Sequence, residues 1–526
     1  MHVTGVGDAI PAQPQQAAAD FSDIGFDYML AICSAIEEIS RRLVHVEPAA
    51  LSYRGANLRF AIERDLYFSL LNNDPVRAYY LQLRQVPGRS PGGRVAGEFR
   101  CSAANGRLAL HYVPSAGAVL RRTAARLRNR CLGRAAQRLT NRLLRSAPEI
   151  SKSSLYVVTH HPRFVSYLEP IVREFGADHV TWISTSRLLS EFLRKRHLPY
   201  VPLDRWTELT YGRASGPLLH APSPGYSYML AQHDALRELF SVHRPGCLLL
   251  VEGNSPGDEV ANQAAHAAGI PTVCIQQGWS PVIHVGFRNM SYSKMLVWGQ
   301  GFAQELQPYN PNQQFVVTGS HALDQAAPSP PDWLRLQAEE RTVVTFFLQS
   351  PRDMIGPRRW REFLRLAAAV AQRWPSVLVL VREHPQYKLT ADDRLELAQA
   401  QNICISRPAD CGLAETLAAS HISVSIYSTT ILESVAAGVP PVIYNCTSMP
   451  RFSPDVGSLG AGVEVRDFAG ALREIGELIE NSARRDALRS GMDRFRQHYF
   501  HGQDGQSCTR IVSEIRQVAG VSATSS

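Results

Sequence analysis

Apolar and polar positions alternate along most of the chain in a way that predicts strands followed by helices. The apolar runs 247–251 and 377–382 each end at a polar loop, and their length and composition are those of buried strands. After the first run, 258–268 has helical periodicity, and a further apolar run follows at 272–276. Strands that alternate with helices predict parallel sheets built from βαβ units, so the expected fold class is α/β.

Changes in this pattern divide the chain into four parts. Strand–helix alternation begins near residue 151, and the Pro-rich stretch 327–332 interrupts it. A chain of 526 residues is also too long for one ordinary domain. We therefore expect a disordered tail, a mainly helical N-terminal region and two Rossmann-like domains, at 1–20, 21–150, 151–325 and 335–520.

The stretch 422–444 is the most informative part of the chain. Its pattern predicts a strand, a polar loop of Ser428, Thr429 and Thr430, a short helix that carries Glu433, and a second strand. Free backbone N–H groups and the helix dipole at such a helix N-terminus favour phosphate. The Glu433 carboxylate can accept hydrogen bonds from a ribose diol. The stretch therefore predicts a site for an anion and a sugar hydroxyl.

A second predicted strand end brings a cation and an imidazole to the same sheet edge. The run V-L-V-L-V-R-E-H-P ends in Arg382 and His384. Open α/β folds bind nucleotides where the carboxyl ends of parallel strands face each other. Ser350 and Arg352 follow the strand that opens the second Rossmann-like domain. They are further candidates for a phosphate contact, and they fit an ordinary surface loop equally well.

The two motifs R-x-H-P and S-T-T-x-x-E-x-x-x-x-G-x-P resemble the nucleotide-binding half of GT-B glycosyltransferases of bacterial surface polysaccharides. Similar arrangements occur in sialyltransferases, polysialyltransferases, Kdo transferases and CDP-glycerol glycerophosphotransferases, and UDP-GlcNAc 2-epimerases share the two-domain fold. The resemblance covers about 155 to the end of the chain. It implies two Rossmann-like domains facing a cleft, with C-terminal helices that return in part to the first domain. It also implies that His384 and the 428–430 loop hold the donor phosphate, with Glu433 on the ribose.

Glu252 is the leading candidate for the catalytic base. It ends a buried strand in V-E-G, where a charge is costly unless it faces a cleft. Sialyltransferase-like families carry an acidic–acidic–Gly motif here, and the resemblance implies that the acidic residue before Gly is the base. Val251 at the first acidic position disfavours sialic-type donors. Asp258 and Glu259 are alternatives, but carboxylates in a first helical turn also interact favourably with the helix dipole.

Other candidates follow neighbouring strands of the first Rossmann-like domain. His160, His161 and Arg163 lie where a carboxylate of the acceptor or donor is expected, with His161 as a catalytic candidate and the other two as acceptor contacts. They are explained equally well as residues of an ordinary loop. Gln277 is a further acceptor candidate, because 276–278 matches the family's Q-H-G with Gln in place of His. In glycerophosphotransferase relatives that His is the base, so its absence weakens a polyol-phosphate substrate.

The charge balance predicts an anionic partner. The net charge is +8, and the segment 119–145 carries nine arginines and no acidic residue. Its leucines recur at helical spacing, so we expect an amphipathic helix that lies on an anionic membrane surface or packs its leucines on the protein. We expect no nucleic-acid partner, because no aromatic base-stacking platform accompanies the arginines. Without an apparent signal peptide or an apolar run of about 18 residues, we expect a cytoplasmic protein, peripheral on the inner face of the membrane.

These observations predict a metal-independent glycosyltransferase that moves a sugar from a nucleotide donor to a lipid-linked or oligosaccharide acceptor in capsule or lipopolysaccharide synthesis. We expect no metal and no cofactor, because the sequence has no well-placed D-x-D and no His/Cys cluster with ligand spacing. One alternative is a UDP-GlcNAc 2-epimerase-like isomerase. Those enzymes carry an acidic residue where this chain has Q-Q-G at 276–278, and they lack such an N-terminal region. A non-catalytic GT-B partner in a polysaccharide assembly complex is the other alternative.

Overall fold

The structure is a computed structural model of the chain. It describes residues 25–85, 92–96, 98–117, 119–120, 123–124, 154–211, 221–324, 328–349, 355–385, 387–447, 449 and 452–521. The tail at 1–20, most of the basic segment 119–145, and the candidates Ser350 and Arg352 lie outside the described residues. In the basic segment, 119–120 and 123–124 are described, and they are helical.

The first domain is a parallel sheet between helices. Over the described parts of 154–324 its elements are β6 (Leu155–Thr159), α5 (Pro162–Phe175), η3 (Ala177–His179), β7 (Val180–Ser184), α6 (Arg187–Lys195), β8 (Tyr200–Pro202), α7 (Leu203–Thr210), α8 (Tyr226–Val242), β9 (Cys247–Val251), α9 (Pro256–Ala267), β10 (Thr272–Ile275), η4 (Val285–Phe287), β11 (Lys294–Val297), α10 (Gln300–Leu306), η5 (Gln307–Tyr309) and β12 (Phe315–Val317). The described strands form a seven-stranded parallel sheet in the order β12-β11-β10-β9-β6-β7-β8.

The second domain repeats this architecture. In the described parts of 328–521 the elements are α11 (Asp332–Ala338), β13 (Val343–Phe347), α12 (Gly356–Arg373), β14 (Leu378–Arg382), α13 (Ala391–Leu397), β15 (Ile403–Ser406), α14 (Leu413–Ala418), β16 (Ile422–Ser425), α15 (Thr429–Ala436), β17 (Pro441–Tyr444), β18 (Val463–Val465), α16 (Phe468–Glu480), α17 (Ser482–Tyr499), η6 (His501–Gln503) and α18 (Ser507–Ala519). These strands make a six-stranded parallel sheet, ordered β15-β14-β13-β16-β17-β18.

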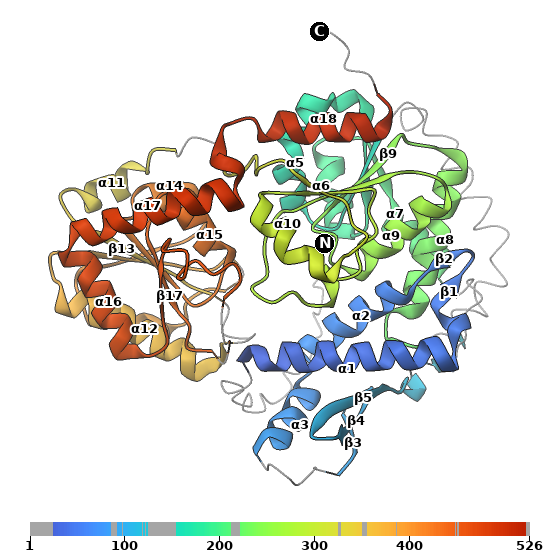
Figure 1. Cartoon of the computed structure of the whole chain (residues 1–526), viewed down its shortest axis with the longest axis horizontal. Helices are drawn as coiled ribbons and strands as arrows, with labels where there is room; N and C mark the ends of the chain where they lie inside the picture. Colours follow the sequence, from blue (N-terminus) through green and yellow to red (C-terminus); the bar gives the residue numbers. More distant parts are fainter. Residues whose placement is uncertain are drawn as a thin grey trace, which may run out of the picture.

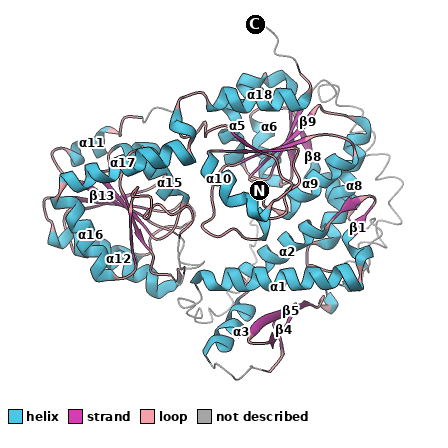
Figure 2. Ribbon diagram, viewed as in Figure 1, coloured by secondary structure: helices cyan, strands magenta, loops and turns pink. Residues whose placement is uncertain are grey.

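The strands are parallel and central because their side chains are buried on both faces. All five residues of β9, Cys-Leu-Leu-Leu-Val, are buried, and so are all five of β14. A parallel sheet covered by helices on both faces requires such continuous apolar runs, and burying one Leu or Val side chain contributes about 1.5–3 kcal/mol. Figure 2 shows the two sheets, in magenta, each between cyan helices. The predicted α/β class with two Rossmann-like domains is confirmed.

The last helix, α18, lies on the first domain (Figure 1). Its buried side chains Ile511, Val512 and Ile515 belong to the hydrophobic core of the first sheet. A polar contact also holds it there, because Lys294 Nζ of β11 donates to Glu514 at 2.6 Å. The chain end therefore returns from the second domain to the first.

The N-terminal region is helical, with two small sheets. Its described elements are α1 (Gly25–Val46), η1 (Pro48–Leu51), β1 (Ser52–Tyr53), β2 (Ala56–Asn57), α2 (Arg59–Leu71), α3 (Asp74–Gln85), β3 (Arg94–Ala96), β4 (Phe99–Ala104) and β5 (Arg107–Tyr112). The antiparallel sheet β3-β4-β5 was not predicted, because a mainly helical region was expected at 21–150. Its β4–β5 turn is Asn105-Gly106, with φ of 50° and 72°. Asn-Gly is a strong hairpin signal because both central residues adopt positive φ easily.

Packing joins the three parts of the molecule. One hydrophobic cluster contains Ile36 of α1, Val285 and Phe302 of the first domain, and Ile431 and Phe452 of the second. In the part of the chain that the structure describes, no helix combines the length and the apolar character that crossing a membrane requires.

Candidate functional site

The predicted site residues lie at the topological switch points of both sheets. In the first domain the strand order reverses between β6 and β9, and in the second between β13 and β16. Open α/β sheets bind ligands in the crevice outside these strand ends. His160, His161 and Arg163 follow β6, and Glu252 follows β9. The 428–430 loop follows β16, so each domain presents one of the two main motifs at its crevice.

Glu252 has an unusual backbone conformation. Its φ is 61°, and Gly253 follows with a φ of 67°. The Glu252 N–H donates to the Ile275 carbonyl at 2.9 Å, and the Gly253 N–H donates to the Val251 carbonyl at 2.7 Å. A left-handed residue other than Gly costs about 1–2 kcal/mol and persists only where its surroundings hold it. Burial raises the pKa of the Glu252 carboxyl, the charge of Arg163 offsets part of this shift, and Asp258 adds to it.

Gly278 lies between Glu252 and the 428–430 loop. A Cβ added to Gly278 would lie 3.3 Å from Glu252 Oε1 and 3.7 Å from Thr429 Oγ1. Glu252 Oε1 and Thr429 Oγ1 are therefore at most about 7 Å apart. The candidate base of the first domain and the candidate phosphate loop of the second therefore face each other across a residue with no side chain.

The 428–430 loop is the start of α15, as the sequence predicted. Ser428 caps the helix: its Oγ accepts the Thr430 N–H at 3.1 Å. The Tyr427 N–H donates to Gln349 Oε1 at 2.9 Å, which ties the loop to the end of β13. Burial raises the pKa of Glu433 to about 7, although Thr430 and Arg382 partly oppose the shift. Three groups therefore lie close together: the N-terminus of α15, the hydroxyls of the 428–430 loop and the Glu433 carboxyl.

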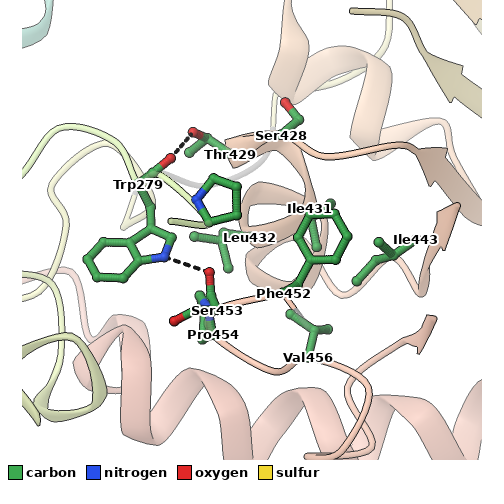
Figure 3. A pocket seen from close by; sticks show the side chains of 11 residues that line it. Trp279, Ser428, Thr429, Ile431, Leu432, Ile443, Phe452, Ser453, Pro454 and Val456 are labelled. Atoms are coloured by element: carbon green, nitrogen blue, oxygen red, sulfur yellow. Dashed lines mark hydrogen bonds between the residues drawn. The ribbon is translucent and has the colours of Figure 1, made fainter. Parts of the chain in front are cut away.

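Trp279 connects this loop to the first domain. Its indole Nε1 donates to the Ser453 carbonyl at 2.7 Å, and Thr429 Oγ1 donates to the Trp279 carbonyl at 3.4 Å. Figure 3 shows Trp279 between these two partners, beside a small pocket. Apolar side chains make up much of the pocket wall: Ile431, Leu432, Ile443, Phe452 and Val456. Ser428 and Thr429 of the 428–430 loop also line this pocket, and its volume of about 20 Å³ is no larger than one water molecule needs.

Arg382 and His384 differ in how they are engaged. Arg382 is buried, and its Nη1 donates to the Cys411 carbonyl at 2.6 Å and to Thr416 Oγ1 at 2.9 Å. Arg382 thus holds the start of α14 against β14. His384 is half-buried in the turn after β14, where its carbonyl accepts the Tyr387 N–H at 3.1 Å. Because β13 alone separates β14 from β16, the ends of these two strands lie about 10 Å apart along the sheet edge.

The loop after β6 places basic groups beside Glu252. His161 caps α5, because its Nδ1 accepts the Arg163 N–H at 3.1 Å. The Arg163 guanidinium lies over the Phe164 ring at 4.6 Å and interacts electrostatically with Glu252. Burial lowers the pKa of His160, and Arg163 and His161 lower it further, whereas Asp258 raises it.

The alternative carboxylates have structural partners. Asp258 forms a capping box with Ser255, whose Oγ donates to Asp258 Oδ2 at 2.7 Å. Glu259 has no exposed surface, and its Oε2 accepts from Arg64 Nη1 at 2.7 Å. Both residues therefore stabilise the start of α9, and Glu252 remains the leading candidate for the base at this strand end.

Sequence reasoning missed the aromatic residues that support the 276–278 stretch. The Gln276 carbonyl accepts from Tyr167 Oη at 3.0 Å and from Trp298 Nε1 at 2.9 Å. Gln276 Oε1 accepts the Trp298 N–H at 3.0 Å. Gln277, the predicted acceptor contact, follows and is half-buried. Isolated aromatics carry no local sequence signal for such a role. Within the described ranges, no group of three or more His, Cys, Asp or Glu side chains is arranged to hold a metal ion.

Comparisons with known proteins agree with this architecture. No protein-family model matches the sequence, and no curated protein matches it. A structure from Listeria monocytogenes, assigned as a UDP-N-acetylglucosamine 2-epimerase, is similar with a TM-score of 0.50 and 14% identity, over 70% of this chain and 96% of that chain. Another UDP-N-acetylglucosamine 2-epimerase has a TM-score of 0.50 and 15% identity, over 70% and 97% of the two chains. At such identities the likeness concerns the fold, and the chain has the GT-B fold.

Proposed function

We propose that the protein is a nucleotide-sugar-dependent glycosyltransferase of bacterial surface polysaccharide synthesis, acting on capsule or lipopolysaccharide without a metal ion. The observation that carries the proposal is the pair Glu252 and Thr429, one from each domain, on either side of Gly278. Sugar transfer needs a base near the acceptor hydroxyl and an anion site for the leaving nucleotide. The superposed epimerases are named for a nucleotide-sugar substrate, which supports a donor of this class.

The geometry supports an inverting displacement. Glu252 removes the proton of the acceptor hydroxyl while that oxygen bonds to the anomeric carbon of the donor. The bond from this carbon to the phosphate oxygen breaks, and its electron pair leaves with the nucleotide. The N–H groups at the start of α15 and the loop hydroxyls stabilise the new phosphate charge. The raised pKa of Glu252 makes it a stronger base near neutral pH.

An epimerase-like isomerase is the second candidate, because the two superposed structures are UDP-N-acetylglucosamine 2-epimerases. In this chain 276–278 presents amides, and Gln276 is committed to Trp298. An amide neither removes nor supplies the proton that epimerisation moves, so the transferase is favoured.

A ligand panel tests the proposal. CMP, CDP, UDP, GDP and ADP are added to the full-length protein, and its melting temperature is measured. Ligand at about 100 times its Kd stabilises a protein by about 2.7 kcal/mol, a shift of several degrees. We expect one nucleotide to give this shift, and we expect Ser428→Ala and His384→Ala to lose it.

Asn481→Ala is the matched control, because Asn481 Oδ1 caps α17 by accepting the Arg484 N–H at 3.1 Å, and α17 begins after α16, at the sheet edge opposite the 428–430 loop. Both cap variants lose about 1 kcal/mol of stability, but only Ser428→Ala loses the ligand shift. No shift with any nucleotide contradicts the proposal and favours a non-catalytic GT-B partner. Conversion of a bound UDP-sugar to an epimer without an acceptor identifies the isomerase instead.

A further inference from the structure

We propose that the N-terminal helices α1 and α2 are part of the scaffold of the site. In this proposal, Phe26 positions the 428–430 loop of the second domain, and Arg64 positions the Glu252 turn of the first. The contacts are independent of the reaction, whereas their consequence for catalysis rests on the proposed function. Figure 1 shows α1 running below the first domain, with its first turns toward the second.

The contact to the second domain is aromatic. Phe26, in the first turn of α1, is 1% exposed, and its ring meets Tyr427 edge-on with 4.7 Å between centroids. Tyr427 directly precedes the helix cap Ser428, and its N–H donates to Gln349 Oε1. An edge-to-face pair contributes about 0.5–1.5 kcal/mol beyond its buried area. Phe26 therefore restricts the position of Tyr427, and Tyr427 leads directly into the 428–430 loop.

The same helices are anchored on the first domain. Glu37 of α1 forms an ion pair with Arg288. Tyr67 of α2 stacks on His284, with 4.3 Å between centroids and 8° between ring planes. His284 borders η4, so α1 and α2 are both fixed on the loops that follow β10. One rigid pair of helices thus contacts both domains.

Arg64 connects α2 to the Glu252 turn. The Arg64 and Glu259 side chains are fully buried, and their 2.7 Å contact fixes the start of α9, a few residues after Glu252. The Arg64 charge also acts on Tyr292, whose Oη donates to the Gly253 carbonyl at 2.8 Å. A Cβ added to Gly253 would lie only 2.5 Å from Tyr292 Oη and 2.7 Å from Cys274 Sγ. The turn therefore packs closely against these two side chains.

This arrangement explains how Glu252 keeps a left-handed backbone. Strained residues persist where neighbouring structure fixes them, and here Tyr292 and the start of α9 do so. A buried ion pair contributes little net stability, because desolvation offsets much of the attraction, but loss of one partner is strongly destabilising. The Arg64–Glu259 pair therefore fixes the start of α9, and removal of Arg64 alone leaves the buried Glu259 carboxylate without this partner.

Hydrogen exchange of the full-length protein tests the proposal, with Phe26→Ala and Arg64→Met as controls for each other. We expect Phe26→Ala to speed amide exchange over 427–436 at least about fivefold and to leave 252–262 unchanged. We expect Arg64→Met to speed amide exchange over 252–262 and to leave 427–436 unchanged. Equal acceleration of both stretches, or of neither, overturns the proposal. If a variant does not fold, Phe26→Leu and Arg64→Lys are measured in its place, with the same selectivity expected at smaller size.

Nucleotide titration separates this proposal from the proposed function. If the wild-type protein binds one nucleotide of the panel, Phe26→Ala weakens that binding at least about fivefold, as misplaced loop groups lose contacts. Arg64→Met keeps the affinity and lowers turnover, since its effect passes through Glu252. If no nucleotide binds, the proposed function fails, and the exchange pattern still decides whether the helices hold the two loops.

Discussion

At the scale of single residues, Glu433 has the clearest electrostatic signature. Burial raises its pKa from 4.5 to about 7. The folded chain therefore binds this proton more tightly than the unfolded chain between these pH values. The stability linked to the proton is complete below pH 4.5 and is lost as the pH rises through about 7. The ionised form is the one that accepts hydrogen bonds from a ribose diol.

Glu433→Gln removes this titration. We expect the variant to melt at a higher temperature than wild type at pH 8, with a difference that disappears at pH 5. Nucleotide affinity of the wild type should rise with pH through about 7, because only the carboxylate accepts both ribose hydroxyls, and this rise should be absent in the variant. Thermal denaturation and titration at pH 5, 6, 7 and 8 check both results. Identical pH profiles for the two proteins contradict the assignment.

Local chemistry explains why some residue positions were predictable and others were not. Glu252 and the 428–430 loop follow buried strands, and apolar runs reveal where such strands end. Arg382 ends such a strand, so its place was predictable. The hydrogen bonds of its guanidinium to Cys411 and Thr416 were not, because they depend on where the later helix α14 packs. The contact between Phe26 and Tyr427 joins opposite ends of the chain, and no local pattern encodes it.

At the scale of elements, the buried strands were predicted well because burial on both faces leaves continuous apolar runs. The sheet β3-β4-β5 was missed because its strands are only partly apolar and mix buried with exposed residues, as in Phe-Arg-Cys-Ser-Ala-Ala of β4. Its Asn-Gly turn was the available signal. The helix α15 was predicted because Ser428, a good cap, precedes it and Gly438 follows it.

The basic segment 119–145 gives a prediction at this scale. Each Arg near an anionic bilayer contributes about 1 kcal/mol, so four of them change binding by roughly 10²- to 10³-fold. We expect replacement of Arg126, Arg130, Arg134 and Arg138 by Gln to reduce binding to phosphatidylglycerol vesicles by about this factor. Co-sedimentation measures it, and neutral phosphatidylcholine vesicles serve as the control. Unchanged binding to the anionic vesicles contradicts a membrane role for the segment.

At the scale of the whole molecule, hydrogen bonds supplement the hydrophobic cluster that the two domains share. Trp279 donates to the Ser453 carbonyl, and Tyr499 Oη donates to Glu305 Oε1 at 2.9 Å. The helices α1 and α18 add contacts at other sides of the same junction. If the protein is the transferase proposed above, water must be excluded from the closed cleft, and contacts that favour closure also favour transfer over hydrolysis.

Trp279→Phe tests this junction while keeping an aromatic ring in place. The variant loses one partly buried hydrogen bond between the domains, about 1 kcal/mol, which changes the ratio of open to closed molecules about fivefold. We expect a larger radius of gyration in solution scattering and faster hydrolysis of the donor. Trp298→Phe is the matched control, because its Nε1 donates at 2.9 Å to Gln276 within one domain. If both variants change the radius of gyration equally, the Trp279 bond has no special part in closure. If only Trp279→Phe changes it, cleft closure depends on this contact between the domains.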